Sequence, residues 1–144
     1  MRHTGPYGAL IGRILLALIF VMSGMNKIAM PEATQQYMAS HGMTVATGVL
    51  YVGAIAVEVG AGLALLFGYQ TRRAGLLLAI FLIPTTLIFH TNFADQNQLI
   101  HFLKNLAIMG GLFYVAVYGP GPMSIDARSM PRHHSTGLTA VDGG

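Results

Sequence analysis

Residues 9–27 read ALIGRILLALIFVMSGMNK, and this stretch decides the class of fold. Arg13 is its only charged residue before the terminal Lys27. A helix needs about 20 mostly apolar residues to cross the hydrocarbon core of a bilayer, and this stretch is long enough. It has no convincing small-residue cleavage site, and further apolar stretches follow it. We therefore expect a retained first membrane helix rather than a signal peptide.

The whole chain shares this apolar character. Of its 144 residues, 53% are hydrophobic and only 9% are charged, whereas a soluble domain typically carries about 25% charged residues. The basic residues form no patch, which argues against nucleic-acid binding. The chain contains no cysteine, so it cannot supply disulfides, thiolate metal ligands or iron–sulfur ligands. Any redox role must use a borrowed cofactor.

Three more apolar stretches predict three more membrane helices, at residues 45–67, 74–90 and 99–118. The second predicted span is rich in glycine and alanine, which let helix backbones approach closely in lipid, so we expect it at the centre of the bundle. Pro84 should bend the third span. The more polar segment 30–42 indicates a loop or an interfacial helix. The predicted fold is all-α, an integral membrane four-helix bundle.

Arginines predict the orientation, because cytoplasmic loops near membrane spans accumulate Lys and Arg. Four spans place the amino end, the second loop and the carboxyl tail on one side, and these segments hold Arg2, Arg72, Arg73, Arg128 and Arg132. The other two loops hold Glu32 and Asp95. We therefore expect both termini in the cytoplasm. The predicted parts are a cytoplasmic N-terminus (1–8), a transmembrane domain (9–122) and a flexible cytoplasmic tail (123–144).

Glu58 is the only acidic residue within a predicted span. A rise of about 1.5 Å per residue puts Arg13 about 6 Å and Glu58 about 10 Å from the cytoplasmic face. An ionisable residue at such a depth needs a partner, so we predict an intramembrane ion pair between Arg13 and Glu58. The pair could serve only to lock two helices together. Alternatively, Glu58 is a proton-carrying or ligand-binding carboxylate.

A second polar group is predicted near the outer face, and its members are Lys27, His90, His101, Lys104 and Asn105. The last three share one helix side by their i, i+3 and i+4 spacing. No carboxylate is expected at this depth, so the group is net positive and rich in donors. Such a site suits an anion, a phosphate head group or the carbonyl oxygens of a quinone. The alternative is that terminal lysines extend to the interface and each histidine bonds locally.

No catalytic residue and no metal site is predicted. Two histidines near one face are a weak signal for haem, and the adjacent tail residues His133 and His134 fit metal-ligand spacing poorly.

The chain resembles the DoxX family of small four-helix bacterial membrane proteins between Arg13 and Arg128. The motifs that carry the resemblance follow in order along the chain: Arg13 with FVMSGMNK at 20–27, QYMAS at 36–40, Glu58 in a small-residue helix, GYQTR at 68–72, Lys104-Asn105, and GPG at 119–121 with Ser124 and Asp126.

The resemblance implies an inner-membrane protein linked to redox systems, because DoxX relatives are associated with thiosulfate oxidation coupled to quinone and with redox defence assemblies. The preferred function is a membrane subunit or anchor of a redox system that interacts with quinone. Its partners would be the bilayer and a membrane or peripheral redox protein, with homo-oligomerisation left open. Two alternatives remain: a small-solute carrier with a mid-bilayer cavity containing Glu58, and a structural assembly factor without a ligand site.

Overall fold

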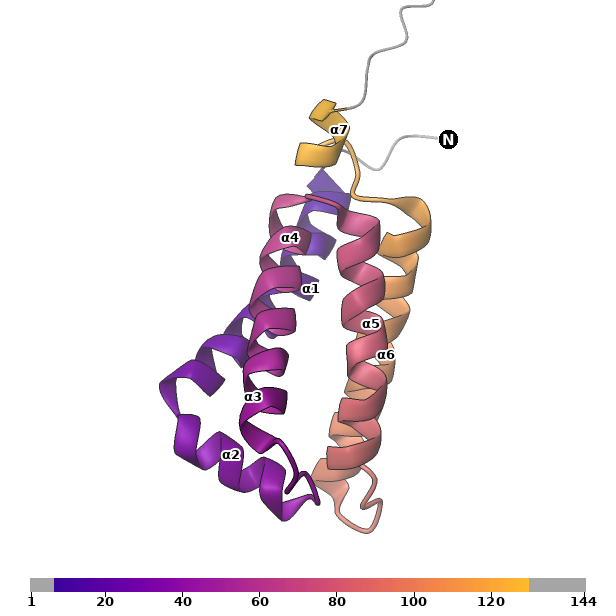
Figure 1. Ribbon diagram of the computed structural model, residues 1–144. Helices are drawn as coiled ribbons and strands as arrows, with labels where there is room; N and C mark the ends of the chain where they lie inside the picture. Colours follow the sequence, from indigo (N-terminus) through magenta and orange to yellow (C-terminus); the bar gives the residue numbers. More distant parts are fainter. Residues whose placement is uncertain (1–6, 130–144) are drawn as a thin grey trace, which may run out of the picture.

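The computed structural model describes residues 7–129, and these residues form helices and connecting turns with no strand. Four helices are long and apolar enough to cross a membrane, as Figure 1 shows. They are α1 (Tyr7–Ala29), a composite helix made of α3 (Thr47–Ile55), η1 (Ala56–Ala61) and α4 (Gly62–Phe67), α5 (Thr71–Phe89), and α6 (Gln96–Tyr118). The predicted all-α class and the four apolar helices are confirmed.

Two short helices complete the fold. The first, α2 (Pro31–Ser40), follows α1 and lies at the end of the bundle far from Tyr7 (Figure 1). The second, α7 (Ile125–Ser129), lies at the opposite end. We call the end that carries Tyr7 and α7 the termini face, and the end that carries α2 and the turn 90–95 the loop face. Segment 30–42, expected as a loop or an interfacial helix, is thus largely helical.

Small residues set the register between α1 and the composite helix. A Cβ on Gly24 would lie 2.5 Å from a methyl of Val59 and 3.3 Å from Cβ of Glu58, so the backbones touch there. A Cβ on Gly62 would lie 3.0 Å from a methyl of Val21. Such close approach is typical of membrane helices, whose association depends on packing rather than on water exclusion. Gly24 and Glu58 therefore lie at the same level of the bundle.

The tightest packing lies in the half of the bundle near the termini face. The core includes Phe20, Leu65, Leu78 and Leu112, which are almost completely buried. On the loop-face side, α1 diverges from α5 and α6 (Figure 1). Pro84 lies within α5 without ending it.

The middle of the second crossing is a π-helix, η1, and Glu58 lies in it. A π turn inserts extra backbone into an α-helix, and such turns occur frequently at functional sites. Nothing in the residue pattern indicated this feature, because alanine, valine and glycine also suit an ordinary α-helix.

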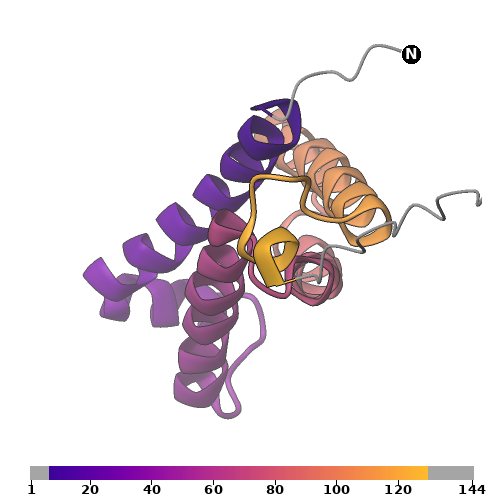
Figure 2. The ribbon, with the colours of Figure 1, turned by 90° about the horizontal axis from the view of Figure 1, so that it is seen from above.

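The chain after α6 folds back over the termini face, where Figure 2 shows α7 above the ends of α4 and α5. The Asp126 backbone N–H donates to the Gly68 carbonyl at 2.9 Å. The start of the segment expected as a flexible tail, residues 123–129, is therefore held in place. The remainder of that tail, Arg2, Arg132, His133 and His134 lie outside the described residues.

Candidate functional site: a cavity in the loop-face half of the bundle

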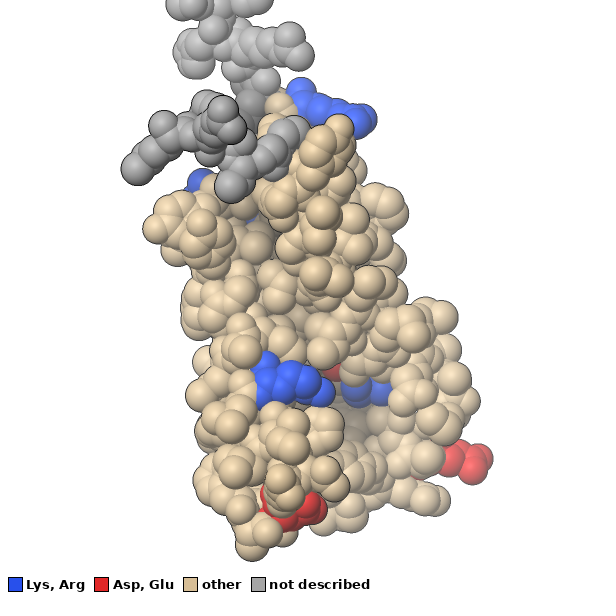
Figure 3. Space-filling view, turned by 180° about the vertical axis from the view of Figure 1, so that it is seen from behind, with Lys and Arg blue, Asp and Glu red and all other residues tan. Residues whose placement is uncertain are grey.

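A cavity of about 1020 Å³ lies between α1, α2, α3, η1, α5 and α6. Figure 3 shows a hollow on the rear of the molecule, flanked by blue side chains with red between them. The walls are mostly apolar, and the polar or charged side chains that line the cavity are Ser23, Asn26, Lys27, Thr34, Tyr37, Glu58, Thr85, His90, His101, Lys104 and Asn105. Tyr37 of α2 stacks on Phe89 of α5 with ring centroids 5.3 Å apart, which ties α2 to the bundle.

An ion pair between Lys27 and Glu58 forms one polar wall. The Lys27 Nζ lies 3.0 Å from Oε1 and 2.9 Å from Oε2 of Glu58. Ser23 donates to Oε1 at 3.2 Å. Only 5% of Glu58 is exposed, so the charge of the carboxylate is balanced almost entirely from within the protein.

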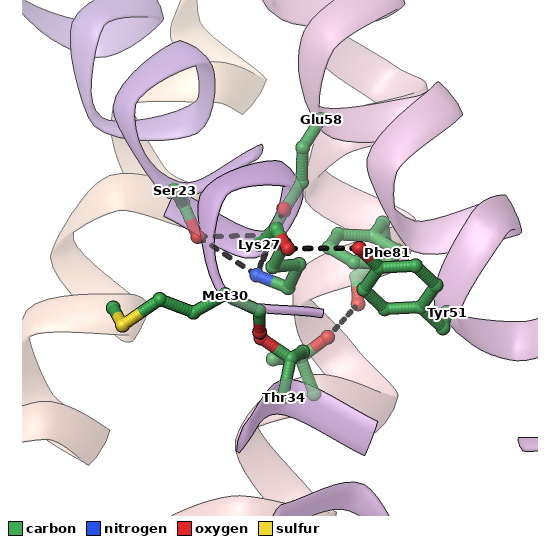
Figure 4. A network of polar contacts seen from close by, with 8 residues as sticks. Ser23, Lys27, Met30, Thr34, Tyr51, Glu58 and Phe81 are labelled. Carbon is green, nitrogen blue, oxygen red and sulfur yellow. Dashed lines mark hydrogen bonds and ion pairs between the residues drawn. The ribbon is translucent and has the colours of Figure 1, made fainter. Parts of the chain in front are cut away.

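The end of α1 holds Lys27 in this position. The Tyr51 hydroxyl of α3 donates to the Lys27 carbonyl at 2.8 Å, which satisfies a carbonyl that the end of the helix leaves free. Lys27 Nζ also donates to the Ser23 hydroxyl at 3.0 Å, one turn earlier on α1. Figure 4 shows Ser23, Lys27, Tyr51 and Glu58 converging from α1, α3 and η1.

The opposite wall belongs to α5 and α6. Lys104 Nζ lies 3.1 Å from Nδ1 of His101, and the His101 ring stacks on that of His90 with centroids 5.1 Å apart. His90 in turn contacts Gln98 Oε1 at 3.0 Å. Asn105 differs from these, because it is buried and its amide donates to Thr86 Oγ1 at 3.0 Å. Asn105 joins α5 to α6 as much as it lines the cavity.

All five residues of the predicted polar group line this single cavity. The expectation that no carboxylate lies at their level needs correction, since Glu58 lines the cavity too. The charged side chains on its wall are Lys27, Glu58 and Lys104, so the wall carries one net positive charge with both histidines neutral. Lys104 has no carboxylate within 4.0 Å among the described residues, whose one salt bridge is Lys27–Glu58.

The predicted ion pair between Arg13 and Glu58 is also corrected. Glu58 lies level with Gly24, and the 11 residues from Arg13 to Gly24 correspond to about 16 Å of helix. Arg13 instead donates to the carbonyls of Pro120 and Met123, the latter at 2.7 Å, near the termini face. Depth counted along the sequence does not include the close contacts of Gly24 and Gly62, which set the register between the two helices.

Ser23 and Tyr51 were not among the predicted site residues. Ser23 could have been found, because it precedes Lys27 by four residues and therefore shares its helix face. Tyr51 gave no usable signal, because an aromatic residue in an apolar span is usually packing. Both side chains position the ion pair rather than add charge to the cavity.

Four apolar helices around a cavity with charged side chains on its walls define a small multi-pass membrane protein. The DoxX family model matches residues 8–91, and the chain belongs to the DoxX family.

Two relatives come from Escherichia coli strain K12. Inner membrane protein YqjF is 40% identical over 126 residues, which cover 88% of this chain and 95% of the relative. Inner membrane protein YphA is 34% identical over 128 residues, which cover 85% and 91%. No solved structure gives a significant match. This chain is thus a DoxX-family protein with four helices long and apolar enough to cross a membrane.

Proposed function

We propose that this protein is a membrane subunit or anchor of a redox system and that its cavity binds the head ring of a quinone. The observation that carries the proposal is the cavity itself, which combines apolar walls with Lys104 on one side and the Lys27–Glu58 pair on the other. Ligand pockets are typically apolar clefts of about 300 to 1,000 Å³ with a few polar groups that fix orientation. An anchor role also requires a redox partner, which co-purification in mild detergent would identify.

Lys104 is the strongest donor toward a quinone carbonyl. Its ammonium has three N–H groups, and the one polar neighbour found among the described residues is His101. The hollow in Figure 3 lies on the flank of the bundle, so a ligand's apolar tail could remain in the surrounding lipid. His101 holds the Lys104 ammonium at the cavity wall.

Replacing Lys104 with methionine should weaken the binding of a short-tailed quinone analogue by about 1.5 to 3 kcal/mol, the range for a hydrogen bond with a charged donor. The measurement is the dissociation constant in detergent, with Arg128→Met as the control because Arg128 is exposed on the termini face. Unchanged affinity in Lys104→Met, or no binding to the unmodified protein, would contradict the quinone proposal and leave contact with lipid head groups as the simpler account.

A small-solute carrier is the second candidate, and Glu58 on the cavity wall favours it. A carrier must also open toward the termini face, where Phe20, Leu65, Leu78 and Leu112 now fill the core. Carriers usually open by moving two repeated halves against each other, and the sequence shows no convincing internal repeat. The quinone-binding role needs no such second conformation.

We further propose that the termini face is cytoplasmic. It carries Arg72, Arg73 and Arg128, whereas Glu32 and Asp95 belong to the loop face. Figure 3 shows this separation as blue at one end and red at the other. Reporter fusions at Gln70 and after Arg128 should both read cytoplasmic, and one at Asp95 should read periplasmic. A periplasmic signal from the fusion after Arg128 would contradict this orientation.

A further inference from the structure

Helix α2 and the residue before it form the part of the cavity wall at the loop face. The side chains that they contribute to the lining are Met30, Ala33, Thr34, Tyr37 and Met38. Met38 is the one buried residue of α2, and the other residues of this helix are partly or fully exposed. Helix α2 therefore covers the cavity without being packed into the core of the bundle.

The contact between α2 and α5 consists of stacked rings. Tyr37 stacks on Phe89 with ring centroids 5.3 Å apart, and the His41 ring lies 5.1 Å from that of Phe89 and 4.4 Å from that of Tyr37. His41 Nδ1 also lies 2.9 Å from the Tyr37 carbonyl, which orients the ring. Among residues 7–129, no hydrogen bond or ion pair joins α2 to α5 or α6. The position of α2 over the cavity thus depends on the packing of a few side chains.

Breaks in the helical backbone separate α2 from its neighbours in the chain. Only Met30, with a non-helical φ of −130° and ψ of 67°, lies between the end of α1 and the start of α2. At the other end Gly42 has a φ of 87°, in the left-handed region that glycine adopts without steric cost. Because both connections are non-helical, α2 can move as a unit relative to α1 and α3.

The flank between α1 and α6 has no such cover. A Cβ on Gly111 would lie 3.1 Å from a methyl of Leu16, so α1 and α6 are in contact there. Further toward the loop face, side chains between positions 19 and 27 of α1 and between 101 and 108 of α6 line the cavity, which separates the two helices. Figure 3 shows a hollow on this rear side of the molecule.

We propose that α2 is a lid that closes the cavity toward water at the loop face, and that a ligand enters from the bilayer between α1 and α6. Apolar side chains next to the cavity-lining residues of these helices, Met22 on α1 and Leu103 on α6, are exposed and suit contact with acyl chains. This path admits a molecule that is dissolved in the bilayer. The inference goes beyond the quinone, because it holds for any ligand of that class.

The closed lid affects the chemistry of the site as well as access to it. Hydrogen bonds and ion pairs are stronger where bulk water is excluded, because the local dielectric is lower. With α2 in place, the Lys27–Glu58 pair and the Lys104 ammonium on the cavity wall are shielded from the water at the loop face. A bilayer-borne ligand therefore meets Lys104 without competition from bulk water.

The test uses the absence of cysteine from the natural chain. Ala54→Cys places a single thiol on the cavity wall, and the full-length protein is held in lipid nanodiscs that leave both faces accessible. Two methanethiosulfonates are compared, an apolar benzyl reagent and a water-soluble sulfonatoethyl reagent. We expect the benzyl reagent to label Ala54→Cys and the sulfonatoethyl reagent to label it far more slowly. Thr85→Cys repeats the measurement from the α5 wall.

Two control positions calibrate the reagents. Asn92→Cys lies in the exposed turn at the loop face and should react readily with both reagents. Leu77→Cys lies on an exposed part of α5 that does not line the cavity, and it should react with the benzyl reagent only. Equal rates of the sulfonatoethyl reagent at Ala54→Cys and Asn92→Cys would overturn the lid. No reaction of Ala54→Cys and Thr85→Cys with the benzyl reagent would overturn entry from the bilayer.

Variants of the ring contact test whether it holds the lid closed. Adding Tyr37→Ala to Ala54→Cys should speed labelling by the sulfonatoethyl reagent about tenfold or more, because the stacked ring is lost and the open form becomes more populated. His41→Ala should also speed it, and it removes no side chain from the cavity wall. Tyr37→Phe keeps the ring and should change nothing. Unchanged rates in both Tyr37→Ala and His41→Ala would overturn this role of the rings. No quinone is used, so the proposed function is tested separately.

Discussion

Replacing Lys27 with methionine is expected to lower the free energy of unfolding by about 3 to 5 kcal/mol, because the change leaves a buried carboxylate without its counter-charge. Glu58 is 5% exposed, and Ser23 would be its one remaining donor among the described residues. Replacing Glu58 with leucine should cost less, since Lys27 is 23% exposed and its ammonium can turn toward water. Thermal unfolding in detergent measures both changes.

The double variant Lys27→Met/Glu58→Leu should recover much of the loss, since replacing both members of a buried ion pair by apolar residues is often neutral or stabilising. The matched control pairs Glu58→Leu with Arg13→Met. Those two sites are about 16 Å apart along the bundle, so their effects should add to within about 0.5 kcal/mol. A Lys27/Glu58 double variant as unstable as the sum of its singles would show that the two side chains do not interact.

The four crossings could be predicted from the sequence because apolar length is a local property of the chain. The predicted second span, residues 45–67, corresponds to Thr47–Phe67 in the structure. The π turn around Glu58 could not be predicted, because the same small and β-branched residues form the α-helix α3 just before it. π turns are rare, and this residue pattern carries no signal that distinguishes one from an α-helix.

The partners of the buried charges were predicted less well than the charges themselves. Residue counting along straight helices placed Arg13 beside Glu58, whereas the contact of Gly24 with Val59 sets a register that brings Lys27 there. The i, i+3 and i+4 spacing of His101, Lys104 and Asn105 did place them on one cavity wall. Sequence spacing thus predicts which residues share one face of a helix. The relative depth of residues on two different helices depends on the packing contacts between those helices.

The role of Asp126 also depends on tertiary structure. Its carboxylate accepts hydrogen bonds from the backbone N–H groups of Gln70 and Thr71, each at 2.8 Å, and from the Thr71 hydroxyl at 2.7 Å. Burial alone would raise the pKa of Asp126, but these hydrogen bonds and the charge of Arg13 outweigh burial and hold the pKa below its usual value. Asp126 therefore stays charged at neutral pH and caps the start of α5.

Arg13 also holds the segment 119–129 in place, through hydrogen bonds from its guanidinium. Only 2% of Arg13 is exposed, and its guanidinium donates to the carbonyls of Pro120 and Met123. Gly68 permits this arrangement, since a Cβ there would lie 2.4 Å from Cβ of Ser124 and 3.0 Å from the Arg13 guanidinium carbon. Arg13 thus joins the first crossing to residues more than 100 positions later in the chain.

Replacing Arg13 with methionine should lower the free energy of unfolding by about 3 kcal/mol or more, because its hydrogen bonds to the carbonyls of Leu66, Pro120 and Met123 are lost and the two shorter ones are each worth about 1.5 to 3 kcal/mol. The segment 119–129 should also become accessible to protease, which a general loss of stability elsewhere would not single out. Arg73→Met is the control on the same face. Within residues 7–129 the Arg73 side chain bonds only that of Gln70, so this change should alter stability by no more than about 0.5 kcal/mol. Arg13→Lys should restore little, because a single ammonium lacks the planar fork that reaches two separate carbonyls. Stability and cleavage of Arg13→Met equal to those of Arg73→Met would show that Arg13 does not hold the carboxyl segment.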